Sequence, residues 1–203
     1  VDEIKKQPDY GTMCIAALDP SAQASPDIYP DNLVRLFSHI QEETKEKPVQ
    51  EELIGSVRTD FDIAPGSIVS SHFIISWYFP NLKIDESIKD SGRYYQNRFT
   101  SAFDVAQYIQ KHFKQLSTQT LLWASTWQDS TLPHWFLERT FINIDTLATT
   151  NCHRFSSGRF WAWEGVGACG GTCTHVWQYA QAMGRIFPAL ERDCRERTEL
   201  NIA

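Results

Sequence analysis

The stretch around Glu164 holds the densest group of side chains that could do chemistry. Glu164 is its one carboxylate, and it follows Trp161 and Trp163 and precedes a glycine. A carboxylate between aromatic and small residues is typical of an acid in a cleft with aromatic walls. The residue types leave an alternative open, in which the glutamate is buried and bonded to backbone amides or to Arg154 or Arg159.

Glycoside hydrolysis is the reaction that such a carboxylate would serve. That reaction needs two carboxyl groups around the scissile bond, about 5–5.5 Å apart in retaining enzymes. Glu164 is a candidate for one of them. The nearest others in sequence are Asp129 and Asp145, but Asp129 suits a turn or helix cap before Pro133. The second carboxylate therefore stays unidentified.

Cysteine and histidine residues in the same stretch suggest other chemistry. Five of them are potential zinc ligands: Cys152, His153, Cys169, Cys173 and His175. Their Cys-x3-Cys-x-His spacing matches no common zinc motif. Further alternatives are a Cys169–Cys173 or Cys152–Cys169 disulfide and a nucleophilic Cys173 activated by His175.

Composition excludes several classes of protein. The 203 residues are 42% hydrophobic, 22% charged and 13% aromatic, as expected for a soluble globular chain, and the net charge of −6 excludes a basic nucleic-acid footprint. Residues 1–60 carry twelve acidic and six basic side chains, whereas 61–203 carry thirteen of each. No window approaches the roughly twenty apolar residues of a membrane span, and Val1 to Lys6 lacks a signal-peptide core. Compartment and oligomeric state stay open.

The first half of the chain predicts strands with one helix. A buried strand is expected over residues 10–18 and an amphipathic helix from Asp31 to Ile40. Two further strands, over 53–61 and 67–79, are predicted to pair as the closing hairpin of a β-sandwich, because Pro65-Gly66 favours a tight turn between them.

After residue 80 the apolar period changes from two to about 3.6, which predicts helices. Thr100 or Ser101 should cap a long helix that ends near Trp127, and further helices should begin near Pro133, Thr172 and Pro188. The apolar face of the long helix is expected to contain Phe103, Ala106, Ile109, Phe113, Leu116 and Thr120. Successive helices without strands between them predict an all-α second domain.

The chain resembles glycoside hydrolase family 116, which contains the non-lysosomal glucosylceramidases and bacterial β-glucosidases. The segments that carry this resemblance are Ile63 to Gly66, Ser76 to Asn81, Asp129 to Trp135, Gly158 to Gly165, Thr172 to Val176 and Phe187 to Glu191. The resemblance implies an α+β fragment of two domains, in which the end of a β-sandwich precedes the first helices of an (α/α)6 barrel. The implied boundaries are 1–85 for the sandwich part, 86–98 for a linker and 99–203 for the barrel part.

The same resemblance implies a retaining β-glucosidase or glucosylceramidase with Glu164 as catalytic nucleophile and no metal or organic cofactor. Arg159, Trp161, Trp163, His175 and Trp177 are the residues expected to bind the glycoside, an oligosaccharide or a glycolipid. Where the family has an Asp-Val-His triplet, this chain has His175-Val176-Trp177. A non-catalytic carbohydrate-binding relative is therefore an alternative. The family's general acid lies further along the barrel, which implies that residues 1–203 alone are inactive.

Overall fold

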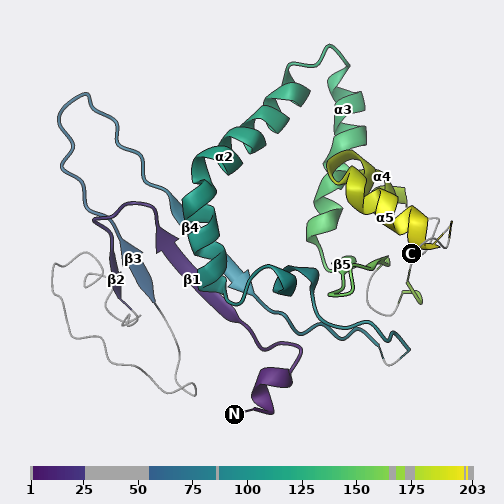
Figure 1. The fold of residues 1–203 in the computed structure, drawn as a ribbon. Coiled ribbons are helices and arrows are strands. Elements are labelled where there is room, and N and C mark those ends of the chain that lie inside the picture. The colour runs from purple at the N-terminus through teal and green to yellow at the C-terminus, as the bar shows by residue number, and fades with distance from the viewer. Residues whose placement is uncertain are drawn as a thin grey trace. The chain divides into compact units, whose positions relative to one another are not determined.

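The computed structural model describes residues 2–25, 55–85, 87–164, 168–171, 177–198 and 200 (Figure 1). These residues form a mixture of helices and small antiparallel sheets. The strands are β1 (Thr12–Ala17), β2 (Gln23–Ser25), β3 (Ser56–Arg58), β4 (Phe73–Tyr78), β5 (Cys152–Arg154) and β6 (Phe160–Ala162). The helices are α2 (Ala102–Gln128), α3 (His134–Phe141), α4 (Trp177–Ile186) and α5 (Pro188–Thr198), with short 3-10 helices η1 (Ile4–Lys6), η2 (Tyr94–Asn97) and η3 (Ile142–Ala148). The α+β class is confirmed.

The chain divides into two compact units. One contains Thr12–Tyr78 and Ser101–Phe113, and the other contains Val1–Gly11, Phe79–Thr100 and Lys114–Ala203. The segment between β4 and α2 thus belongs to the same unit as the C-terminal helices. The boundaries 1–85, 86–98 and 99–203 stay predictions.

In the first unit, β1 and β4 form an antiparallel pair from Thr12 opposite Tyr78 to Ala17 opposite Phe73. Because side chains alternate across a strand, Ile74 and Ser76 of β4 are buried, whereas Ile75 and Trp77 are exposed. The Ser76 hydroxyl donates a 2.8 Å hydrogen bond to the carbonyl of Ala102 at the start of α2. This bond ties the buried face of the sheet to the helix.

The predicted hairpin of residues 53–61 and 67–79 is wrong in its pairing. Both strands form, but β4 pairs with β1, and β3 pairs with β2. The tight turn itself is present, since the Ser67 amide donates to the Ala64 carbonyl at 3.0 Å and Gly66 has a φ of 79°. The residues on either side of this turn are not strands, so the turn lies within a loop and does not connect two paired strands.

Helix α2 confirms the predicted long helix and its cap. The Asp104 amide donates to the Ser101 hydroxyl at 3.1 Å, which satisfies one of the free N–H groups of the first turn. The buried face is set by Ala102 and Ala106, while Phe103 and Thr120 are exposed. The predicted apolar face is corrected at these positions, because the helix meets the sheet at Ala102, whose amide and carbonyl bond to Thr12 and Ser76, and Phe103 points away from the buried side.

The second unit contains α3, α4, α5 and the β5–β6 hairpin (Figure 1). The helices predicted near Pro133 and Pro188 are confirmed, and α4 confirms the one predicted near Thr172, whose residues 172–176 lie outside the described part of the chain. The hairpin between η3 and α4 corrects the expectation of helices without intervening strands. The predicted helix over residues 31–40 also lies outside the described residues. Among the described helices, none is long and apolar enough to cross a membrane.

Candidate functional site

Four of the residues expected to do chemistry, Arg159, Trp161, Trp163 and Glu164, lie on or next to the β5–β6 hairpin. Cys152 pairs with Ala162, His153 with Trp161 and Arg154 with Phe160. The turn is closed by two backbone hydrogen bonds, from the Phe155 amide to the Arg159 carbonyl at 2.9 Å and from the Gly158 amide to the Phe155 carbonyl at 2.8 Å. Gly158 has a φ of 92°, a left-handed conformation that glycine adopts without strain.

Both faces of the hairpin are packed. On one face Trp161 (2% exposed) and Phe155 (0% exposed) form a core with Leu82, against which Ile84, Ile88 and Trp163 pack. On the other face Cys152 and Ala162 contact Leu147 and Phe160. A two-stranded hairpin is marginal in water by itself, so this packing on both sides is what holds it in place.

Glu164 follows directly on the open end of this hairpin and is exposed. The preceding residue, Trp163, is fixed by three contacts. Its amide donates to the Asn151 carbonyl at 3.0 Å, and its indole N–H donates to the Thr150 carbonyl at 3.1 Å. Its ring also packs on Trp161, with 4.7 Å between the ring centroids. The backbone that leads into Glu164 is therefore anchored, and Glu164 itself is exposed.

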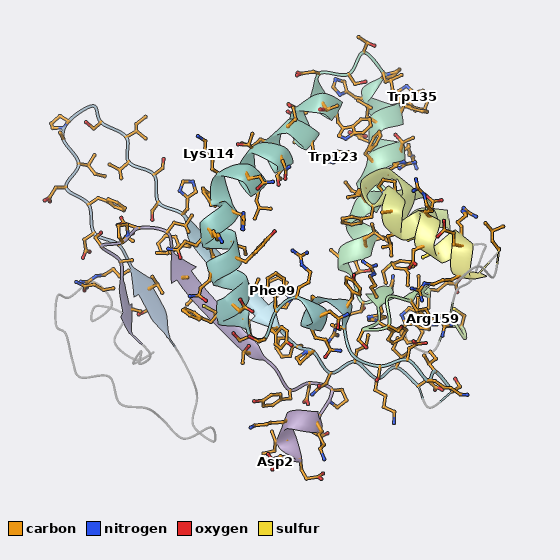
Figure 2. The ribbon with its side chains drawn as sticks, viewed as in Figure 1. Asp2, Phe99, Lys114, Trp123, Trp135 and Arg159 are labelled. Carbon is orange, nitrogen blue, oxygen red and sulfur yellow. The ribbon has the colours of Figure 1, made fainter. Side chains whose placement is uncertain are left out.

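Asp90 holds the closed end of the hairpin. Its carboxylate accepts a 2.6 Å hydrogen bond from the Ser157 hydroxyl and a 2.9 Å ion-paired hydrogen bond from the Arg159 guanidinium, labelled in Figure 2. These bonds, that of Ser157 first, lower the pKa of Asp90 below its ordinary value, because they favour the charged carboxylate. Arg159 is thus engaged in an ion pair within the protein.

His153 lies beside the buried tryptophan. Its ring stacks on Trp161 with 5.9 Å between centroids and 29° between ring planes. Burial and the charge of Arg93 lower the pKa of His153, although a hydrogen bond to the backbone of Thr150 opposes this shift. The imidazole is therefore neutral around pH 7 and acts here as part of the aromatic stack.

The structure brings together four of the six predicted site residues. Glu164, Trp161, Trp163 and Arg159 lie along one strand and its ends. Trp177 is the first residue of α4, with its side chain outside the description, and His175 lies outside the described residues. Of the four, Glu164 and Arg159 are exposed and Trp161 is fully covered. Substrate contact by these residues stays a prediction.

The structure tests part of the zinc and disulfide alternatives. Within the described ranges, no group of three or more histidine, cysteine, aspartate or glutamate side chains is placed to hold a metal ion. Cys173 and His175 fall in a range that the structure leaves undescribed. Cys152 is a buried free thiol, so the Cys152–Cys169 disulfide is not formed. Burial raises the pKa of this thiol to about 12, which makes it a poor nucleophile.

Sequence reasoning missed the supporting residues of the hairpin. Asp90 is far from Glu164 in sequence, yet its carboxylate holds the hairpin turn. Gly171 belongs to no recognised motif, yet it lies against the ring of Trp161. One available signal was Ser156-Ser157-Gly158, since a glycine after two turn-forming residues is typical of a hairpin loop. No comparable signal marks Asp90, whose partners are brought to it by the fold.

Comparison with known proteins gives one match. The model of the family described as beta-glucosidase 2, glycosyl-hydrolase family 116 N-term, matches residues 2–116, more than half of the chain. No curated protein and no solved structure matches. The match covers β1 to β4, the segment that contains Asp90 and the first half of α2. The chain therefore belongs to glycosyl-hydrolase family 116, with residues 2–116 in the region of that family's N-terminal domain.

Proposed function

We propose that this protein is a retaining β-glucosidase or glucosylceramidase and that Glu164 is its catalytic nucleophile. The observation that carries the proposal is the family match over residues 2–116, which points to a glycoside hydrolase. The local structure around Glu164 supports the choice of residue, because an exposed carboxylate follows an anchored strand. A nucleophile needs both access to the sugar and a fixed position.

The chemistry follows from two carboxyl groups. A Glu164 oxygen attacks the anomeric carbon, the bond to the leaving oxygen breaks, and a second carboxylic acid gives that oxygen a proton. The glycosyl ester is then hydrolysed by water, which loses its proton to the second carboxylate as the Glu164 carboxylate is released. The second carboxyl group is not assigned to a residue of this chain. No step requires a metal or an organic cofactor.

The glycoside is proposed to contact the aromatic residues nearest the carboxylate. Trp163 is half-buried and fixed next to Glu164, so its ring offers an apolar surface to a sugar face. Trp177, the first residue of α4, and His175, which lies outside the described residues, are also proposed to contact the glycoside. Arg159 and Trp161 are proposed to act mainly by shaping the hairpin, because one is paired with Asp90 and the other is buried.

The helices are proposed to be the first part of an (α/α)6 barrel, and the β1–β4 and β2–β3 pairs the end of a β-sandwich. Four helices follow one another after β4, with the short β5–β6 hairpin as the only described sheet among them. This order of strands followed by helices favours two domains of different class.

Covalent trapping tests the function. The full-length protein is incubated with an activated 2-deoxy-2-fluoro-β-glucoside, which stops retaining enzymes at the glycosyl-enzyme stage, and is then analysed by intact mass and peptide mapping. We expect one sugar adduct, on Glu164, and its loss in Glu164→Gln. Glu138→Gln is the matched control, because Glu138 is an exposed glutamate of the same unit on α3.

Two results would overturn the assignment. An adduct on another carboxylate would refute Glu164 as nucleophile. A folded protein that binds β-glucosides without an adduct or turnover would instead be the non-catalytic carbohydrate-binding relative.

A further inference from the structure

The segment between β4 and α2 folds back on itself before it meets the hairpin. The Gly92 amide donates to the Leu82 carbonyl at 2.8 Å, and the Arg93 amide donates to the Pro80 carbonyl at 2.8 Å. The Arg93 guanidinium donates to the Phe79 carbonyl at 2.8 Å, a carbonyl that also accepts a 2.7 Å hydrogen bond from the Tyr95 hydroxyl. Residues 79–85 and 87–95 are therefore joined to one another by internal hydrogen bonds.

This segment is hydrogen-bonded to the hairpin turn at Ser156. The Ser156 amide donates to the Gly92 carbonyl at 2.9 Å, and its hydroxyl donates to the Ser91 carbonyl at 2.7 Å. The Asn97 side-chain amide donates to the Ser156 carbonyl at 2.8 Å. All three hydrogen-bonding groups of Ser156 are thus used by residues 91–97.

Asp90 extends these contacts to Ser157 and Arg159, on the two sides of Gly158. Its carboxylate binds Ser157 and Arg159 at once, so it bridges the turn and the first residue before β6. Leu82 from the same segment packs with Phe155 and Trp161 in the core below. Polar contacts at the turn and apolar contacts under the strand thus come from one segment.

We infer that residues 79–85 and 87–97 form a brace for the β5–β6 hairpin and that Asp90 is a positioning residue for Glu164. The inference rests on the proposed function of Glu164. The brace holds one end of β6, and Glu164 lies two residues beyond the other end, after the anchored Trp163, so a shift of the turn is carried along the strand to Glu164. The family match assigns this brace to the N-terminal domain region, although it belongs to the same compact unit as the hairpin.

Hydrogen exchange tests the brace without reference to activity. In Asp90→Ala, the backbone amides of residues 156–164 should exchange about fivefold faster than in the unsubstituted protein, because a charge-assisted pair and a hydroxyl bond are lost. Asp90→Asn keeps one acceptor oxygen without the charge and should recover part of the protection. Asp60→Ala is the matched control, since it removes an ion pair between the exposed Asp60 and the half-buried Arg58 (3.2 Å) that lies in the other unit.

Trapping kinetics test the positioning. With the fluoroglucoside on the full-length protein, Asp90→Ala should lower the rate constant of Glu164 labelling about tenfold at saturating reagent, with little change in the concentration for half-saturation. If Asp90 had a purely structural role, Asp90→Ala would lower thermal stability but would not lower the rate constant of labelling while leaving the concentration for half-saturation unchanged. Asp90→Asn should restore the rate constant to within about threefold of the original.

The outcomes separate the two proposals. Unchanged exchange of residues 156–164 in Asp90→Ala would refute the brace whatever the activity. Faster exchange with normal labelling of Glu164 would refute Asp90 as a positioning residue. Faster exchange together with no labelling of Glu164 in the unsubstituted protein would refute the proposed function and, with it, the positioning role. Faster exchange together with slower labelling supports both.

Discussion

Gly171 lies against the buried face of Trp161, and replacing it with alanine tests whether that contact holds the candidate site together. Gly171 has a φ of 94°, a conformation that costs a residue with a Cβ atom roughly 1–2 kcal/mol. A Cβ atom added there would also overlap the Trp161 indole ring. Because Trp161 is only 2% exposed and packs on Phe155 and Leu82, the ring cannot move without disturbing the core.

The two costs add to the expected loss of stability. Overpacking of a core typically costs about 1–3 kcal/mol, so Gly171→Ala should lower the free energy of unfolding of this unit by about 2–5 kcal/mol in total. Gly158→Ala is the matched control. Gly158 has nearly the same φ, 92°, but its added Cβ atom would be 3.5 Å from the nearest atom, in the Arg197 guanidinium. It should therefore show the backbone cost alone.

Urea unfolding followed by tryptophan fluorescence measures both variants. Gly170→Ala provides a baseline near zero, because the added Cβ atom meets nothing within 4 Å and φ is not positive. Trp161→Phe combined with Gly171→Ala should recover part of the loss, since the smaller ring relieves the overlap. A Gly171→Ala variant no less stable than Gly158→Ala would refute the packing of Gly171 on Trp161.

Two further predictions concern titration and reactivity. Because the pKa of Asp90 is lowered in the folded state, its contribution to stability should be present above the unfolded-state pKa of about 3.9 and should be lost as pH falls through the lower folded-state pKa. Acid unfolding of Asp90→Asn should lack this contribution, and equal acid profiles for the two proteins would contradict the prediction. Iodoacetamide at pH 8 should label Cys14, which is partly exposed, well before Cys152, whose buried thiol has a pKa raised to about 12. Peptide mapping over time checks the order, and early labelling of Cys152 in the native protein would contradict its burial.

The local sequence was enough to predict most elements. The change of period after residue 80 predicted α2, and Ser101 was recognised as its cap because a serine hydroxyl satisfies a free amide of the first turn. The strand over 10–18 and the helix at Pro188 follow from the same kind of near-neighbour rule, although β1 is not the buried strand that was predicted, since Met13 is 69% and Ile15 45% exposed. The predicted resemblance to family 116 is confirmed by the match over residues 2–116, which includes the segments Ile63 to Gly66 and Ser76 to Asn81 but not those around Glu164.

Only the tertiary structure decided which elements meet. The sequence predicts strands within residues 53–61 and 67–79, and both form, yet β4 pairs with β1. Strand pairing depends on contacts between segments far apart in the chain, and the turn between two neighbouring strands does not decide it. The same holds for the candidate site. The sequence placed a carboxylate between tryptophans, but folding decided that Trp161 is buried while Glu164 is exposed, and that Asp90 closes on Ser157 and Arg159. Side-chain burial and ion pairing are set by long-range packing, on which a local pattern carries no information.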